Sequence, residues 1–336
     1  MAESGFLAGV VGCGRIGSLY DAPGGGPGVY THAGMYRATP GLRLACGADA
    51  DPENARRFAE RWGCADVFGD VATMLARRPV DVLSVTTPDA THEDVVRQAL
   101  GAERPPRIIF LEKPLAGTAA AGERLLAEAE KAGVLLLVNY VRRFDRMHRE
   151  LRDLVRDGGI GKPRLVTGYY VRGLRHNGCH LVNLMRFLAG EIVEAHPVGP
   201  VGGGSLAGDP ALHARVVFAG GAEGLLVALD RPGYAYSLFD LDLFGDTGRL
   251  RLTADGARAE LYPARPDPRF TNFRTLDPVP RVFASTYETA MLEAGAALVR
   301  LLAEPGGPVE NHGEQAVADL RIIEALSPAA APGGEQ

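Results

Sequence analysis

Short apolar runs alternate with amphipathic stretches along the first 140 residues. The apolar runs predict five strands, at Leu7–Val11, Leu42–Ala48, Val80–Thr86, Ile108–Leu111 and Val134–Asn139. Apolar residues at three- and four-residue spacings predict helices between them, at Pro52–Arg61, Val71–Arg77, His92–Leu100 and Ala119–Ala132. The run from Val80 is mostly apolar on both faces, as in a strand covered by helices on both sides. This half therefore predicts a doubly wound, parallel α/β sheet.

The pattern changes after Asn139. A helix is expected over Arg146–Val155, then a strand, a helix near His180 and a series of strand-like segments. Around the turn at residues 245–248, apolar and charged residues alternate with a period of two, which is typical of strands with one buried face. A last helix is expected over Thr286–Ala303. This half predicts an α+β domain with an open, mainly antiparallel sheet.

We therefore expect domains at 1–140 and 141–328, with a mobile tail at 329–336. The segment Asp21–Thr31 is rich in glycine and proline and cannot continue a helix, so it interrupts the first crossover. It is either a loop that covers the site or a surface insertion without consequence. The glycine-rich segment Gly199–Gly208 is expected to be a simple loop.

Composition narrows the class of partner. The chain has 336 residues and a formal net charge of −5, which gives no attraction to nucleic acid or to anionic membranes. No apolar run reaches the roughly 18 residues that a membrane span needs, and the first residues lack the pattern of a secretion signal, so a cytoplasmic protein is expected. The four cysteines have no metal-ligand spacing and are expected to be buried bystanders.

A glycine motif follows the first predicted strand directly. In Gly12-Cys13-Gly14-Arg15-Ile16-Gly17 the first glycine would make a tight turn, the second would let a pyrophosphate approach the backbone, and the third would permit close packing of helix on strand. The following helix would present amide groups to the phosphates. The context of strand, turn and helix predicts a Rossmann domain that binds a dinucleotide.

Asp49 ends the second predicted strand, where a carboxylate accepts hydrogen bonds from the adenosine ribose hydroxyls. Such a carboxylate repels a 2′-phosphate, which favours NAD over NADP. NADP stays open because Arg15 could reach a phosphate. Asp49 could instead cap the next helix, but Asp51 is better placed for that role.

Several motifs together make the chain resemble the Gfo/Idh/MocA family of oxidoreductases. Beyond the glycine motif, they are Thr86-Thr87-Pro88 with His92, Glu112-Lys113-Pro114-Leu115, the run from Asn139 and Tyr140 through Arg142, Arg143 and Phe144 to Asp145, and Gly178-Cys179-His180 followed by Arg186-Phe187-Leu188. The resemblance covers nearly the whole chain.

The resemblance implies roles for residues in these motifs. Thr87, Pro88 and His92 would line the nicotinamide side of the cofactor site, and Glu112 and Lys113 would lie beside the nicotinamide ribose and the substrate. It also implies a cis peptide bond before Pro114, which is credible only because that residue is a proline.

The catalytic pair implied by the resemblance is Lys113 and His180. Lys113 can stabilise developing charge on the reacting oxygen, and His180 can take or return the hydroxyl proton while hydride moves to or from nicotinamide C4. Taken singly, Lys113 could be a solvated charge and His180 a hydrogen-bonded core histidine.

One departure from the family pattern concerns the carboxylates near His180. Sugar and inositol dehydrogenases of the family usually carry an aspartate four residues before this histidine, where this chain has His176 followed by Asn177. The aspartate commonly found three residues after it is Asn183 here. Either His176 or Asn177 substitutes, or the proton takes another route, through Tyr140.

Two further features of the substrate side stay open. His176 and His180 are four residues apart, but Gly178 between them argues against a helix and no third ligand is evident, so no metal is expected. Arg142, Arg143 and Arg172 either hold an anionic group of the substrate or are surface charges.

The leading hypothesis is an NAD(P)-dependent dehydrogenase or reductase of a sugar, a nucleotide-linked sugar or a cyclitol. The alternatives of the same fold are a redox-neutral, NAD-dependent glycosidase and a non-catalytic dinucleotide-binding regulator. An open sheet also favours a homodimer or homotetramer formed through the second domain.

Overall fold

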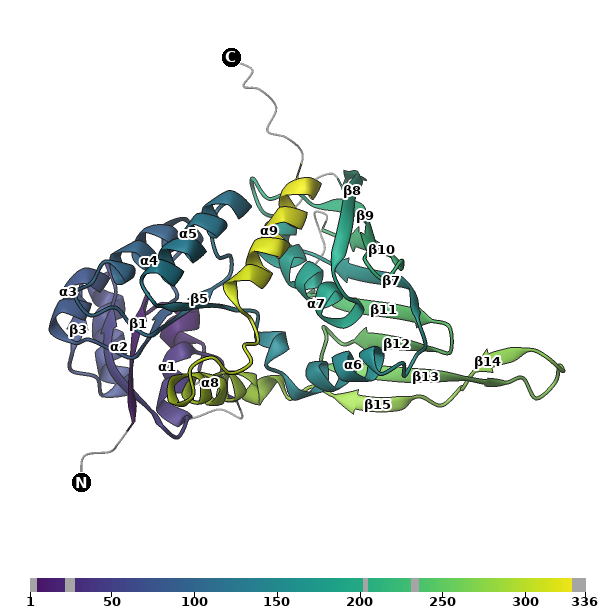
Figure 1. Cartoon of the computed structure of the whole chain (residues 1–336), viewed down its shortest axis with the longest axis horizontal. Coiled ribbons are helices and arrows are strands. Elements are labelled where there is room, and N and C mark those ends of the chain that lie inside the picture. The colour runs from purple at the N-terminus through teal and green to yellow at the C-terminus, as the bar shows by residue number, and fades with distance from the viewer. Residues whose placement is uncertain (1–4, 22–27, 202–204, 231–235, 328–336) are drawn as a thin grey trace, which may run out of the picture. The chain divides into compact units, whose positions relative to one another are not determined.

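A computed structural model describes residues 5–21, 28–201, 205–230 and 236–327 (Figure 1). The chain divides into two compact units. The first comprises Met1–Asp145 with Tyr287–Ala318, and the second comprises Arg146–Thr286 with Asp319–Gln336. The tail expected at 329–336 lies outside the described residues.

The first unit contains a parallel sheet with strand order β3-β2-β1-β4-β5-β6. Its strands are β1 (Phe6–Val11), β2 (Leu42–Ala48), β3 (Val67–Phe68), β4 (Val82–Val85), β5 (Ile108–Glu112) and β6 (Leu135–Asn139). Every pair in it is parallel, and the order reverses between β1 and β4. The predicted doubly wound Rossmann sheet is confirmed. In such sheets ligands bind beyond the carboxyl ends of the strands, where the order reverses.

Helices cover both faces of this sheet. They are α1 (His32–Ala38), α2 (Pro52–Trp62), α3 (Val71–Arg77), α4 (His92–Leu100), α5 (Ala119–Lys131) and α8 (Tyr287–Ala303), with short helical turns η1 (Arg15–Leu19), η2 (Asp89–Thr91) and η3 (Val141–Arg143). In Figure 1, α4 and α5 lie together on one side, and α1 and α8 lie together on the other. Asp51 caps α2 by accepting the Glu53 N–H at 2.9 Å, as the sequence predicts.

The division of the chain differs from the contiguous ranges 1–140 and 141–328. Helix α8 packs on α1 and η3, and Met291, Ala294 and Leu298 join the core of the first unit. The sequence predicts this helix correctly but offers no local signal for the sheet on which its apolar face packs.

The second unit contains a mixed, mostly antiparallel sheet with the order β14-β13-β12-β11-β7-β10-β9-β8, in which β15 also pairs with β13. Its strands are β7 (Pro163–Tyr170), β8 (Ile192–Pro200), β9 (Leu212–Phe218), β10 (Glu223–Ala228), β11 (Phe239–Gly245), β12 (Gly248–Thr253), β13 (Arg258–Pro266), β14 (Arg274–Leu276) and β15 (Arg281–Ala284). Only β7 and β10 pair in parallel among these described strands. The predicted sheet is confirmed, whereas β8 reaches Pro200 and so includes the start of the loop expected at Gly199–Gly208.

Helices of the second unit cover one face of its sheet. They are α6 (Arg146–Arg156), η4 (Gly173–Gly178), α7 (Cys179–Ala189) and the end of α9 (Gly313–Leu326). Helix α7 lies so close to β7 that a side chain at Gly168 would meet Leu181 at 2.6 Å. The position of His180, next to Leu181, is therefore set by tight packing of α7 on the sheet.

Candidate active site

The glycine motif makes a tight turn directly after β1. Gly12 has φ of +91°, and a Cβ there would lie 2.6 Å from the Thr86 carbonyl. A Cβ at Gly17 would collide with the Gly12 carbonyl oxygen, which also accepts a hydrogen bond from the Thr86 hydroxyl at 2.6 Å. Both positions therefore require glycine, one for its backbone conformation and one for close packing.

Gly14 is different, because a Cβ there would meet nothing within 4 Å. Packing within this unit does not explain the absence of a side chain at this half-buried position. The residues fit a dinucleotide, whose pyrophosphate needs close access to this part of the backbone. The Thr87 hydroxyl, beyond β4, is buried and has no hydrogen-bond partner among the described residues, which also fits a group supplied by a ligand.

The helix that follows the glycine turn is only the five-residue η1, with exposed Arg15 and half-buried Ile16. Within the predicted interruption Asp21–Thr31, the described residues Asp21 and 28–31 are not helical, residues 22–27 lie outside the described part, and helix resumes at α1. The Asp21 carboxylate joins the two ends of the intervening segment by accepting hydrogen bonds from the Tyr30 N–H at 2.6 Å and the Thr31 hydroxyl at 2.5 Å. Thr31 then caps α1, whose first residue is His32.

Asp49, just beyond β2, faces the glycine turn. Its Oδ2 accepts the Cys13 N–H at 2.7 Å and its Oδ1 accepts the Asp51 N–H at 2.8 Å. The carboxylate is half-exposed and retains lone pairs for further donors, so ribose hydroxyls could still bind it. Asp49 therefore supports the turn in addition to any contact with a cofactor.

Glu112 ends β5, and the Lys113–Pro114 bond after it is cis, as the resemblance implies. The Glu112 side chain is 15% exposed, and its Oε1 accepts hydrogen bonds from His32 Nε2 at 3.0 Å and Asn139 Nδ2 at 2.7 Å. Burial acts to raise the pKa of Glu112, but the hydrogen bond from His32, the charge of His32 when it is protonated, the bond from Asn139 and the charge of Lys113 outweigh it, so the pKa is lowered. Glu112 is an ionised carboxylate next to Lys113.

His92 lies beneath this region rather than on its surface. The ring is fully buried, and its Nδ1 faces the Pro114 carbonyl at 2.8 Å while its Nε2 faces the Thr87 carbonyl at 2.9 Å. His92 thus links the backbone after β4 to the backbone after β5. Pro88 itself is exposed.

Tyr140 and Arg143 are both buried in the first unit, at 4% and 6% exposure. The Tyr140 carbonyl accepts the side-chain amide of Asn311 at 3.1 Å, which fixes the start of η3. Arg142 places its guanidinium 5.9 Å from the centre of the Tyr287 ring. Arg143 is therefore not a simple surface charge.

In the second unit, His176, Asn177 and His180 lie on one continuous helical segment. The turn η4 runs directly into α7, and Gly178 between them has helical angles of −58° and −30°. The expectation that Gly178 excludes a helix here is wrong, because glycine tolerates helical angles at some cost in entropy. His176 is exposed, and His180 is half-buried.

Carboxylates from elsewhere in the chain support this segment. Asp209 accepts the backbone N–H groups of Arg175 at 2.8 Å and His176 at 2.7 Å, and Asp230 accepts that of Gly173 at 2.9 Å. The Asn177 amide donates to the Val171 carbonyl at 3.0 Å, so it stabilises the turn. Carboxylates that are remote in sequence thus bind the backbone of this segment, whose own motif contains none.

Asn183 and Arg186 on α7 share a buried partner. Asp319 on α9 accepts the Asn183 amide at 2.6 Å and also pairs with the Arg186 guanidinium, and both side chains of the ion pair are 1% exposed. Where relatives commonly have an aspartate, this chain has an amide that binds an aspartate from another helix.

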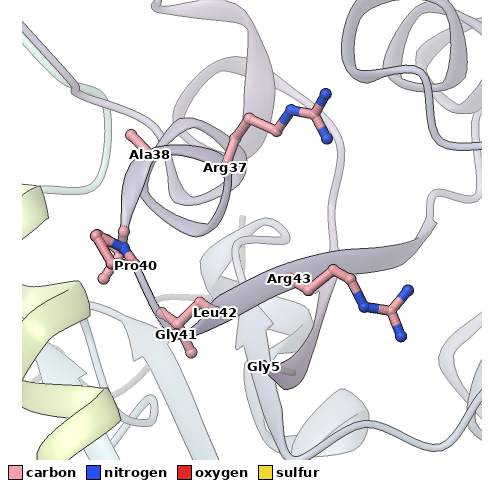
Figure 2. Close-up of a pocket in the computed structure, with 8 residues that line it drawn as sticks. Gly5, Arg37, Ala38, Pro40, Gly41, Leu42 and Arg43 are labelled. Atoms are coloured by element: carbon pink, nitrogen blue, oxygen red, sulfur yellow. The ribbon is translucent and has the colours of Figure 1, made fainter. Parts of the chain in front are cut away.

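A pocket of about 310 Å³ lies at the opposite edge of the first sheet (Figure 2). It is lined by the end of α1 and the beginning of β2, with Arg37 and Arg43 extending from them. Because Gly12 and Asp49 follow the carboxyl ends of β1 and β2, this pocket is distinct from the glycine turn. The described residues contain no group of three or more side chains suited to a metal ion and no helix able to cross a membrane.

The structure brings the glycine turn, Asp49, Thr87 and Glu112–Lys113 to one edge of the first sheet, as the sequence predicts. It places His176, Asn177 and His180 together in the second unit. Sequence reasoning missed His32, Ser84 and Tyr36 behind Glu112, and Asp209, Asp230 and Asp319 behind the helical segment. No motif marks them, because each reaches its partner only through the fold.

Comparison with known proteins identifies the first unit. Residues 6–140 match the model of the Gfo/Idh/MocA oxidoreductase family with its NAD-binding Rossmann fold. This domain is of the Gfo/Idh/MocA type. The resemblance drawn from the sequence motifs is therefore confirmed over these residues.

Two curated relatives extend the comparison. An inositol 2-dehydrogenase of Rubrobacter xylanophilus is 32% identical over 166 residues, which are 49% of this chain and 44% of the relative. A D-apiose dehydrogenase of Paraburkholderia graminis is 24% identical over 317 residues, covering 88% of this chain and 82% of the relative. The matched segment of the first relative is thus less than half of its length.

Among solved structures, a mutant 3-ketoreductase from Actinomadura kijaniata in complex with TDP-benzene and NADP has a similar fold. Its TM-score is 0.73, with 21% identity over 96% of each chain. The chain therefore shares its fold with this solved structure over nearly its whole length.

Proposed function

We propose that this protein is an NAD(P)-dependent oxidoreductase that transfers hydride between nicotinamide and a secondary alcohol or ketone of a sugar, a nucleotide-linked sugar or a cyclitol. The observation that carries the proposal is the gathering of the glycine turn, Asp49 and Glu112–Lys113 beyond the carboxyl ends of β1, β2 and β5. Relatives named as inositol and apiose dehydrogenases support the substrate class.

The cofactor site would comprise residues of the first unit, namely Gly12, Gly14, Arg15, Ile16, Gly17, Asp49, Thr87, Pro88, His92, Glu112 and Lys113. The negative charge of Asp49 favours NAD, and exposed Arg15 keeps NADP possible. His92 would act through the two carbonyls that it bridges, while Gly14 would leave room for the pyrophosphate.

Lys113 and His180 are the proposed catalytic residues. The bound nicotinamide supplies or accepts the hydride at C4. The Lys113 ammonium would donate a hydrogen bond to the reacting oxygen and stabilise charge that develops on it. His180 would accept the hydroxyl proton when the alcohol substrate is oxidised and return it when the ketone is reduced, as a general base and acid.

Substrate binding is assigned to Tyr140, Arg143, His176 and Asn177. The buried guanidinium of Arg143 suits an anionic or polyhydroxylated group better than an exposed arginine would. Because the Asn177 amide donates one N–H to Val171, its carbonyl oxygen and its second N–H would be the groups that contact a substrate.

The proposed assembly is a homodimer or homotetramer through the sheet of the second unit. On β7 and β10, half-buried Leu165 and Tyr169 and exposed Leu225 share one face, opposite the buried Val166 and Tyr170. Apolar side chains on an open sheet face favour association. The cytoplasmic location stays a prediction.

Absorbance at 340 nm with NAD or NADP and a panel of sugars and cyclitols tests the activity. Net formation of NADH or NADPH is expected. A redox-neutral product mixture would instead favour the glycosidase, and dinucleotide binding without any turnover would favour the regulator.

Lys113→Met is expected to abolish turnover and to leave the affinity for NAD close to that of the wild type, because the ammonium acts on the reacting oxygen. Lys131→Met, at an exposed position on α5, is the matched control and should change neither quantity. Unchanged turnover in Lys113→Met would remove this residue from the mechanism.

A further inference from the structure

A buried chain of hydrogen bonds reaches Glu112 from the interior of the first unit. The Tyr36 hydroxyl lies 2.6 Å from Ser84 Oγ, Ser84 Oγ lies 2.6 Å from His32 Nδ1, and His32 Nε2 lies 3.0 Å from Glu112 Oε1. Tyr36, Ser84 and His32 are all 0% exposed. None of these three residues belongs to the glycine motif or to the Glu-Lys-Pro motif.

The chemistry of the end groups gives this chain one direction. An ionised Glu112 can only accept, so His32 Nε2 carries the hydrogen and donates it. In a neutral imidazole, Nδ1 must then accept from the Ser84 hydroxyl, whose oxygen in turn accepts from Tyr36. Burial raises the pKa of Tyr36, which keeps this phenol protonated as the first donor.

Asn139 adds a second donor from β6. Its amide nitrogen lies 2.7 Å from Glu112 Oε1, so both donors converge on one carboxylate oxygen. The Asn139 carbonyl oxygen is buried and has no partner among the described residues. Among the described residues, the hydrogen bonds to the Glu112 carboxylate are accepted by Oε1, so Oε2 stays available to other donors.

We propose that His32 is a positioning residue of this site: with Ser84 and Tyr36 behind it, it holds Glu112 charged and in one orientation beside Lys113. The proposal rests on the proposed oxidoreductase function. The groups that face Glu112 are His32 from α1, Asn139 from β6 and Lys113 in its own segment. Among these groups, His32 is itself held by a further buried partner, Ser84.

The proposal also assigns a function to the interrupted first crossover. Asp21 joins the ends of the glycine- and proline-rich segment, and Thr31 caps α1 immediately before His32. These described anchors place His32 at the start of a helix whose cap, Thr31, is itself held by Asp21.

A measurement on the wild-type protein tests the direction of the chain. ¹⁵N NMR of histidine-labelled protein should show His32 in the single tautomer with hydrogen on Nε2, assigned by its loss in His32→Gln. The Nδ1–H tautomer at neutral pH would overturn the proposal. This result does not depend on any enzymatic activity, so it separates failure of the inference from failure of the proposed function.

Two matched variants test the effect on Glu112. The amide of His32→Gln can replace the Nε2 donor, whereas the shorter His32→Asn cannot reach Glu112. By ¹³C-carboxyl NMR, the pKa of Glu112 should rise in His32→Asn, because burial is then opposed by fewer donors, and should stay near the wild-type value in His32→Gln. Equal pKa values in all three proteins would overturn the proposal.

The effects of the two variants on kcat should rank in the same order as their effects on the pKa of Glu112. In His32→Asn we expect kcat to fall about 10- to 100-fold with a shifted acid limb of its pH profile, because a misplaced reacting group costs about that much. KM for NAD should change little, and His32→Gln should recover most of kcat. A loss of kcat of the same size in both variants, without a shifted pH profile, would indicate a structural role only and would contradict the proposal.

If His32→Asn does not fold, Tyr36→Phe and Ser84→Ala provide the test. Ser84→Ala removes the donor to Nδ1 but leaves Glu112 as the acceptor at Nε2, so the Nε2–H tautomer should persist while the ring loses one of its two anchors. The pKa of Glu112 should then rise, as in His32→Asn. Tyr36→Phe leaves Ser84 in place and should keep the pKa of Glu112 near the wild-type value. An unchanged pKa of Glu112 in folded Ser84→Ala would overturn the role assigned to Ser84 and to the chain.

Discussion

The cofactor edge of the first unit and the helical segment Gly173–His180 of the second are supported in different ways. At the cofactor edge, six consecutive residues from Gly12 to Gly17 carry most of the geometry themselves, through a positive φ and close packing. The helical segment also begins at a glycine with a positive φ, Gly173 at +74°, but its backbone N–H groups are bound by residues that are remote in sequence. Its backbone is held by Asp209 and Asp230, and the helix that follows is held by Asp319.

The difference shows where motif reading succeeds. A turn whose shape depends on its own glycines can be recognised in any context that supplies a strand before it. A segment held by remote carboxylates gives no local sign of its support, and the same His180 could be read as a core residue. A substitution that disrupts the first region should therefore lie within its own motif, whereas one that disrupts the second can lie far away in the sequence.

The largest effect is expected from Asp319→Ala in the second unit. It removes the buried carboxylate that pairs with the Arg186 guanidinium, which keeps the more exposed Glu191, and it removes an acceptor of the Asn183 amide. Breaking a buried ion pair by removing one partner costs about 3–5 kcal/mol, so the free energy of unfolding in urea should fall by about that amount. Glu223→Gln, which breaks the exposed pair with Arg215, is the control and should cost less than about 1 kcal/mol. Similar losses in both would show that α7 does not depend on Asp319.

A second effect separates two glycines of the same turn. Gly17→Ala forces a methyl group against the Gly12 carbonyl and should destabilise the first unit by about 1–3 kcal/mol in chemical denaturation. Gly14→Ala meets nothing within 4 Å, so it should leave stability nearly unchanged and weaken dinucleotide binding in a calorimetric titration. Unchanged binding in Gly14→Ala would contradict the proposed path of the pyrophosphate.

A third effect concerns cofactor choice. Asp49→Ala should narrow the preference for NAD over NADP, because the charge that repels a 2′-phosphate is lost, and kcat/KM with each cofactor measures it. Asp49→Asn keeps an acceptor for the Cys13 N–H, so it should narrow the preference without loosening the turn. A wild type that already prefers NADP would refute the role given to Asp49.

The smallest effect is the contribution of Glu112 to pH-dependent stability. Its pKa in the folded protein lies below the ordinary value of 4.5, so its stabilising contribution is present above that pH and is lost as pH falls through the folded-state pKa. The difference in unfolding free energy between wild type and Glu112→Gln should be constant near neutral pH and shrink below about pH 4.5. A difference that grows on acidification would show that the pKa of Glu112 is raised instead.

Much of the fold follows from local pattern. Strand β2 and helices α3 and α4 have the bounds that their apolar pattern predicts, and at α3 the Asp70 side chain also caps the first turn. Helix α9 and the short β3 were missed, and α8 belongs with the first sheet. These depend on packing between segments far apart in the chain, which periodicity cannot report.

The candidate site divides in the same way. The glycine turn and the place of Asp49 at the end of β2 were predicted from adjacent residues, and the cis bond before Pro114 was implied by the family resemblance; all three are present. His32 could not be found by motif, since its significance comes from Ser84, 52 positions away, and Glu112, 80 positions away. The continuity of η4 with α7 was not predicted, because Gly178 between them argued against a helix.

The Asp21 carboxylate accepts hydrogen bonds from Tyr30 and Thr31 and so joins two points of the chain that are nine and ten positions apart. Loop-closure entropy rises only slowly with length, by about 0.6 kcal/mol for each doubling. The segment between those anchors can therefore be lengthened, shortened or replaced by a foreign epitope with little loss in the free energy of folding. New sequences could be inserted at this position to change the surroundings of the cofactor edge without changes in the sheet.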